Sequence, residues 1–257
     1  MTGFFIKKAF FDGWDNLLTL IALNVGFIVL IILFLAIPMI ASGNVALTIF
    51  MLVLVIYLSH FYAGGVSLFL GDLVFDRAPE FREFPSYITS TWKLSAVFGT
   101  ITTIHVLILM IGFPFYISLG GVFGLAALAI LFWVSVLWWF ISLWIFPVRR
   151  QLNTEVKKVL KKSLILFFDN PGFSVFMGVY SLINFLISVA TAFLVPGLSS
   201  ILYSHQIALK LLMYKYDYIE EHPDTNPKEI PWGALLMNEK EKVGPRSLKG
   251  MIFPWKD

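Results

Sequence analysis

Histidines within apolar stretches are the residues of this chain best placed to do chemistry. His60, His105 and His205 all lie in such stretches, where an ionisable side chain is costly and often functional. Three imidazoles could relay protons or bind a metal ion. No carboxylate lies deep in these stretches, however, and no two of the histidines have the i, i+4 spacing of ligands on one helix face. A hydrogen bond to a neighbouring helix is the commoner role, and no metal or cofactor is predicted.

Two asparagines extend the set of polar residues in apolar surroundings. Asn24 and Asn184 can join neighbouring helices by hydrogen bonds, which is the usual role of Asn in a membrane span. Together with His60 and His105 they could instead line a polar path for a solute. The sequence leaves both alternatives open.

Signatures of enzymes are missing from the chain. It contains no His-Glu-x-x-His, Gly-x-Ser-x-Gly or Walker A motif. Cysteine is also absent, which excludes a thiolate metal site and a cysteine nucleophile. We therefore expect no enzymatic activity and assign no catalytic residue.

Composition places these residues in a membrane protein. Charged residues make up 14% of the 257 residues and the mean hydropathy is +0.83, whereas soluble domains have about 25% charged residues. The net charge of +3 supports no nucleic-acid partner. Because so few charges cannot cover a water-exposed surface, we predict an all-α integral membrane protein.

Six apolar runs approach the roughly 20 residues that cross a bilayer. They cover 17–41, 45–70, 94–118, 122–147, 171–195 and 201–216. The last is the weakest, because it contains His205, Gln206 and Lys210. Six spans with both termini inside would put all 19 Lys and Arg residues on the cytoplasmic side, as the positive-inside rule favours. The sequence thus predicts three helical hairpins with both termini cytoplasmic.

A repeated frame precedes the first and third hairpins. Residues 7–16 read KKAFFDGWDN and residues 161–170 read KKSLILFFDN. In each case a basic, amphipathic segment ends at an Asp-Asn pair and a long apolar run begins. We predict amphipathic cytoplasmic helices at the membrane surface before spans one, three and five. Asp15, Asn16, Asp169 and Asn170 are expected to form the corners by capping the spans that follow.

Basic residues gather again between the fourth and fifth runs. This cluster is expected to meet anionic lipid headgroups, although it also satisfies the positive-inside rule without any further role. Its members are Arg149, Arg150, Lys157, Lys158, Lys161 and Lys162.

The chain divides by composition into a helical bundle, 1–218, and a cytoplasmic Pro-rich tail, 219–257. The tail keeps apolar islands, IPWGALLM and GMIFPW, which a disordered solvated segment would lack. We expect Trp232, Met251, Phe253 and Trp255 to dock, either on the cytoplasmic face of the protein or on a partner.

Three stretches resemble the YesL-like family of bacterial multispan membrane proteins of unknown function. They are AFFDGWDNLLTLIALN, EFREFPSYITSTWKLSAVFG and LWIFPVRRQLNTEVKKVLKKSLILFFDNPGFSVF, and the resemblance covers most of residues 4–215. It implies a bacterial cytoplasmic (inner) membrane location and, since some members are encoded near sugar ABC transporters, at most an accessory role in transport. It supplies no catalytic residue, and the tail lies outside its pattern.

These observations favour a non-catalytic scaffold or accessory subunit of the cytoplasmic membrane. It would bind lipid headgroups and a membrane or cytoplasmic protein partner, such as a transporter. A small permease, with a path along Asn24, His60, His105 and Asn184, is the alternative. A membrane-embedded enzyme acting on a lipid-linked substrate is a distant third.

Overall fold

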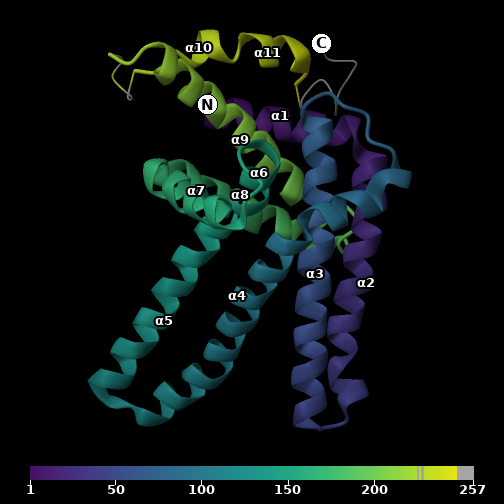
Figure 1. Ribbon diagram of the computed structural model, residues 1–257, viewed down its shortest axis with the longest axis vertical. Coiled ribbons are helices and arrows are strands. Elements are labelled where there is room, and N and C mark those ends of the chain that lie inside the picture. Colours follow the sequence, from purple (N-terminus) through teal and green to yellow (C-terminus); the bar gives the residue numbers. More distant parts are fainter. Residues whose placement is uncertain (225, 227–228, 248–257) are drawn as a thin grey trace.

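Helices account for the regular structure of the chain. A computed structural model describes residues 1–224, 226 and 229–247, and no strand occurs among them. Two long hairpins extend in one direction in Figure 1, and shorter helices gather at their common end. The hairpins are formed by α2 (Leu17–Ala41) with α3 (Val45–Val74) and by α4 (Phe84–Leu119) with α5 (Gly121–Ser142). The shorter helices are α1 (Thr2–Asp15), α6 (Ile145–Gln151), α7 (Val156–Asp169), α10 (Trp232–Leu235) and α11 (Met237–Val243).

Five segments of the described chain are long and apolar enough to cross a membrane. They are Leu17–Ala41, Val45–Val74, Phe81–Leu119, Gly121–Gln151 and Pro171–Ala190. The fifth contains α8 (Pro171–Ala190). Multispan membrane architecture, predicted from composition, is therefore supported for five of the six runs.

The far ends of the two long hairpins expose large apolar side chains. Their turns use left-handed backbone at Ser42 and Gly43 in one hairpin and at Gly120 and Gly121 in the other. The exposed side chains near these turns include Leu35, Met39, Phe115, Ile117, Val122 and Phe123. No Lys or Arg occurs there, as expected of helices that face hydrocarbon. We call the opposite end, which carries α1, α7, α10 and α11, the polar end.

The sixth run is the centre of the protein and not one of the candidate spans. It belongs to α9 (Gly197–Glu221), whose residues from Tyr203 to Leu212 are all buried. The Gln206 amide donates to the carbonyl and hydroxyl oxygens of Ser67 at 3.0 and 2.9 Å. Lys210 Nζ donates to the Val74 carbonyl at 2.8 Å. Gln206 and Lys210 are thus satisfied by protein groups, which a hydropathy count cannot recognise.

The hairpin of α8 and α9 reaches less far than the other two. Its turn is bound by Asn24, whose Nδ2 donates to the carbonyls of Leu194 and Pro196 at 3.0 and 2.9 Å. Asn24 Oδ1 accepts from the Ser199 amide at 2.9 Å. Asn24 lies roughly 27 Å along α2 from the turn at Ser42, at 1.5 Å per residue. Helices α8 and α9 therefore form a hairpin, but its turn stops well short of the hairpin ends and α9 is not among the candidate spans.

The segment before the third span does not form a separate amphipathic helix, so that prediction was wrong. Between α3 and α4 there is only one short 3₁₀ turn, η1 (Phe81–Glu83), and α4 then continues without a break for 36 residues. Pro85 stands in its first turn, where a missing N–H costs nothing. Helices do precede α2 and α8, namely α1 and α7, and both lie across the long hairpins in Figure 1.

The two corners share one geometry that differs from the predicted caps. Neither Asn16 nor Asn170 accepts a hydrogen bond from the helix that follows it. Each instead donates back to the carbonyl four residues earlier, Asn16 to Asp12 at 2.8 Å and Asn170 to Leu166 at 3.3 Å. Each side chain closes the end of the preceding helix rather than the start of the next.

A tyrosine of α9 completes each corner. Asn16 Nδ2 donates to the Tyr203 hydroxyl at 3.4 Å, and Asn170 Nδ2 donates to the Tyr216 hydroxyl at 2.6 Å. One buried helix therefore holds both corners in place.

Candidate functional site

A cavity of about 430 Å³ lies where the two long hairpins meet α9. Its wall is built from α2, α3, α4, α5, α6 and α9, and no charged residue lines it. Most of the lining is apolar and includes Phe34, Val55, Phe98 and Leu202. This volume falls in the range of sites for small molecules, about 300–1,000 Å³.

His60 lines this cavity, but both of its ring nitrogens are already engaged. Nδ1 is 2.7 Å from the Ile56 carbonyl, and Nε2 is 3.0 Å from the Thr102 hydroxyl. The ring also packs edge-on against Phe98, with 4.6 Å between centroids. His60 is therefore a satisfied link between α3 and α4.

His205 also lines the cavity and is only partly satisfied. Its Nε2 is 2.8 Å from the Ser181 hydroxyl of α8, and the residue is 5% exposed. Among the described residues, none bonds its other ring nitrogen. His205 also borders a second cavity of about 330 Å³ between α5, α8 and α9. Sequence reasoning named His205 with the other two histidines as a candidate proton relay or metal ligand, but left it out of the predicted polar path.

The predicted polar path does not come together. Asn24 holds the α8–α9 turn, and Asn184 donates to the Tyr180 carbonyl of its own helix at 2.9 Å. His105 is half-buried on α4 and is not among the residues that line the cavity. Of the four residues, only His60 reaches the cavity, so their arrangement connects no route along the bundle.

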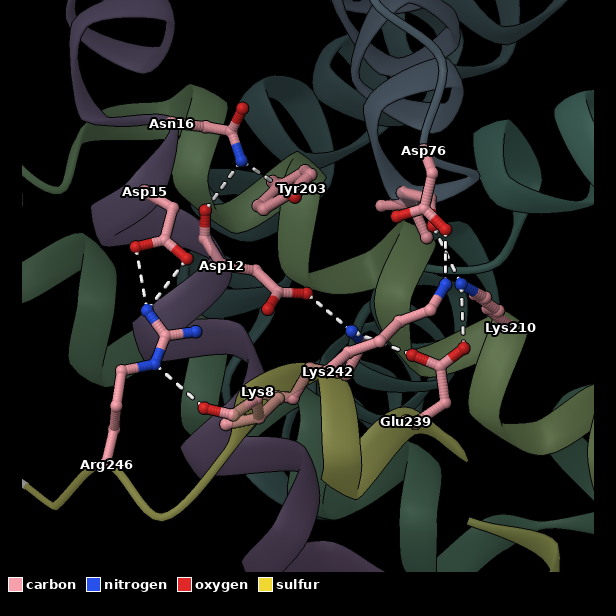
Figure 2. A network of polar contacts seen from close by, with 12 residues as sticks. Lys8, Asp12, Asp15, Asn16, Asp76, Tyr203, Lys210, Glu239, Lys242 and Arg246 are labelled. Atoms are coloured by element: carbon pink, nitrogen blue, oxygen red, sulfur yellow. Dashed lines mark hydrogen bonds and ion pairs between the residues drawn. The ribbon is translucent and has the colours of Figure 1, made fainter. Parts of the chain in front are cut away.

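A second cluster, at the polar end, centres on Glu239 of α11 (Figure 2). Its carboxylate lies between Lys8 of α1 at 2.8 Å and Lys210 of α9 at 2.9 Å. The side chains of Lys8, Glu239 and Lys210 are only 5%, 3% and 10% exposed. The Tyr214 hydroxyl also donates to Glu239 at 2.9 Å, and Lys8 pairs with Asp12 at 2.7 Å. The carboxylate is thus surrounded by donors from two other helices.

These contacts favour the charged forms of Glu239 and Lys8. Burial alone would raise the pKa of Glu239, but hydrogen bonds and charge from Lys8 and Lys210 outweigh it and lower that pKa to about 2. Burial likewise opposes the charge on Lys8, yet Asp12 and Glu239 together raise the pKa of Lys8 above its ordinary value. The ion pairs are therefore fully formed at neutral pH.

Other contacts extend the attachment of the tail along α1. Lys7 Nζ donates to the Gly244 carbonyl at 3.0 Å, and Arg246 binds both carboxylate oxygens of Asp15 at 2.8 Å. Lys242 pairs with Asp76, as Figure 2 shows. The described tail is therefore bound to the same chain.

The predicted docking residues are tested only in part. Trp232 packs against the buried core of its own chain. Met251, Phe253 and Trp255 lie outside the described residues. Glu239 was not predicted, because the docking role was assigned to the apolar islands of the tail and not to the charged segment between them.

The predicted lipid-binding cluster separates into two groups. Arg150 forms an ion pair with Asp72, and Arg149 donates to the Ser90 carbonyl at 2.7 Å, so both arginines serve contacts within the protein. The lysines of α7 remain at the surface: Lys157, Lys158 and Lys161 are exposed, and Lys162 is half-buried. Lys158 pairs with Glu155 at 2.7 Å.

Within the described part of the chain, no three His, Asp or Glu side chains gather as a metal site would require.

Comparison with known proteins does not identify the chain. No protein-family model, curated protein or solved structure matches the chain.

Proposed function

We propose that this protein is a non-catalytic scaffold or accessory subunit of the cytoplasmic membrane that binds anionic lipid headgroups through α7. One observation carries the proposal. Helix α7 carries exposed lysines together with exposed apolar side chains, Leu164, Ile165 and Phe168. A helix with both kinds of side chain on its free surface suits the boundary between headgroups and hydrocarbon.

The orientation of the protein follows from the same end of the molecule. Every candidate span starts or ends near the polar end, and the turns at the other end carry no basic residue. The positive-inside rule then supports a cytoplasmic polar end with both termini on that side. On this proposal α8 and α9 form a short third hairpin, and α9 is a protein-buried helix.

A partner protein would meet a cytoplasmic face already closed by the tail. Because 229–247 is attached to α1 and α9, a partner on this face would contact α7 or the tail helices α10 and α11. This accords with the accessory role that the YesL-like resemblance implies. The permease alternative gains no support, since its four residues do not meet.

The test is lipid selectivity of the intact protein. Replacing Lys157, Lys161 and Lys162 by Gln removes three charges, each worth about 1 kcal/mol near an anionic surface, so affinity for phosphatidylglycerol should fall roughly a hundredfold. Native mass spectrometry in mixed phosphatidylglycerol and phosphatidylcholine would count the bound lipids.

The matched control changes the same three residues to Arg, which keeps the charge and should keep the selectivity. If the Gln variant retains the preference for phosphatidylglycerol, α7 is not the lipid-binding helix and the proposal is wrong.

A further inference from the structure

We propose that the cavity between the hairpins binds a neutral lipid with one apolar chain and a terminal hydroxyl group, and that His205 binds the hydroxyl. The proposal is independent of the function of α7. It rests on the volume of the cavity, on the chemistry of its wall and on one unused ring nitrogen.

The lining of the cavity selects an apolar chain. Phe27, Leu30, Ile31 and Phe34 of α2 line it together with Val55 and Ile56 of α3. Four helices of its wall, α2, α3, α4 and α5, also expose apolar side chains toward the hairpin ends, so on this side its surroundings are apolar rather than aqueous. A chain from the bilayer can enter there without losing contact with apolar groups, whereas a polar solute would lose its water.

The absence of charge in the wall selects a neutral head group. Among the residues that line the cavity there is no Lys, Arg, Asp or Glu. A phosphate or carboxylate would therefore be buried without a counter-ion, at high cost. A hydroxyl group needs only one or two hydrogen-bond partners.

His205 is the partner that the wall provides. It is almost fully buried, and its Nε2 is occupied by Ser181. Its Nδ1 has no partner among the described residues, unlike His60, whose two nitrogens are both engaged. A ring nitrogen can donate to or accept from a hydroxyl. Ser59, which also lines the cavity and is half-buried, offers a second polar contact.

A pair of substitutions separates the two nitrogens of His205. His205→Gln places an amide near the position of Nε2, which can keep the bond to Ser181 and removes Nδ1. His205→Asn places an amide near Nδ1 and gives up Ser181. If the hydroxyl binds Nδ1, the Gln variant should lose affinity for the lipid and the Asn variant should keep it.

The experiment is photolabelling of the full-length protein in phosphatidylcholine nanodiscs. The probes are hexadecanol, palmitic acid and hexadecane, each carrying a diazirine in mid-chain, and labelled peptides are mapped by mass spectrometry. We expect hexadecanol to label 27–34 and 55–63 of the wild type more than the other probes do. His205→Gln should reduce that labelling about fivefold, the worth of one hydrogen bond.

A variant that fills the cavity tests whether a loss of labelling is caused by a blocked cavity or by misfolding. Ser59→Phe should abolish labelling by all three probes within the cavity while leaving the melting temperature near that of wild type. Equal labelling by hexadecanol and hexadecane would overturn the role of His205, and stronger labelling by palmitic acid would overturn the neutral head group. Labelling of 27–34 and 55–63 no greater than that of the exposed stretch 122–130 would overturn the site itself.

Discussion

The two Lys-Lys…Asp-Asn frames form the same kind of backbone corner, but their lysines differ in exposure. In both, an Asn closes the end of a short helix and a tyrosine of α9 binds that Asn. In the first frame, however, Lys8 is buried against Glu239 of the tail. In the second, the equivalent Lys162 is half-buried and its neighbour Lys161 is exposed.

A single aligned position accounts for much of this difference. Position 12 is Asp and the equivalent position 166 is Leu. Asp12 pairs with Lys8 one turn away, which helps to keep a buried ammonium charged. Leu166 is buried in the core and offers its lysines no partner. The frame thus specifies a corner, while the residues between its ends decide whether the lysines are buried against the tail or remain at the surface.

The strongest way to break the comparison is to remove the charge of Glu239. Glu239→Gln leaves Lys8 and Lys210 buried with less opposite charge, and breaking a buried ion pair typically costs about 3 kcal/mol or more. We expect hydrogen exchange of α11 to accelerate by two orders of magnitude in nanodiscs, while exchange of α7 is unchanged. Glu241→Gln, on the exposed side of the same helix, is the control. Equal protection of α11 in both variants would show that the ion pairs do not hold the tail.

Acid should separate the two frames without mutation. The pKa of Glu239 is lowered from 4.5 to about 2, so its contribution to tail binding is fully present above pH 4.5 and is lost as pH falls toward 2. At pH 3.5 the loss is about 1.4 kcal/mol, or tenfold in the binding equilibrium of the tail. The pKa of Asp12 is raised above its ordinary value, so protonation of Asp12 at low pH favours the folded state. The tenfold loss from Glu239 is therefore an upper value.

The measurement is hydrogen exchange of α11 between pH 7 and pH 3.5, corrected for the intrinsic exchange rate. Glu239→Gln should show a much smaller acid effect, because it lacks the titrating group. At high pH, the contribution of Lys8 to tail binding is intact up to its ordinary pKa of 10.5. It is lost as pH rises through the raised pKa that Lys8 has in the folded protein. An acid effect of the same size in α7 would contradict the assignment to Glu239.

Apolar run length was sufficient to predict the five candidate membrane spans. The predicted run 17–41 matches α2, and the run that starts at 45 matches the start of α3. Run length failed for α9, because Gln206 and Lys210 form their hydrogen bonds with oxygens of the protein and not with water. Hydropathy measures transfer into lipid, so it cannot identify a helix whose surroundings are other helices.

The candidate site was less accessible to sequence reasoning. The pairing of Glu239 with Lys8 joins residues 231 positions apart, and no local pattern records such a contact. The corners were predicted from the frame, but the direction of the Asn hydrogen bonds was not, because Asn can donate as readily as it accepts. His205 was named among the three candidate histidines but was left out of the predicted polar path, because Gln206 and Lys210 beside it made its run the weakest predicted span.

The smallest effect should come from the corner tyrosines, and it sharpens the comparison between the frames. Tyr216 lies 2.6 Å from Asn170 Nδ2, whereas Tyr203 lies 3.4 Å from Asn16 Nδ2. A double-mutant cycle of Asn170→Ala with Tyr216→Phe should therefore give a coupling energy of about 1 kcal/mol. The cycle of Asn16→Ala with Tyr203→Phe should give less than half of that, measured by denaturant unfolding in the same detergent. Equal coupling in the two cycles would mean that α9 holds both corners alike, and that the frames differ only in what covers them.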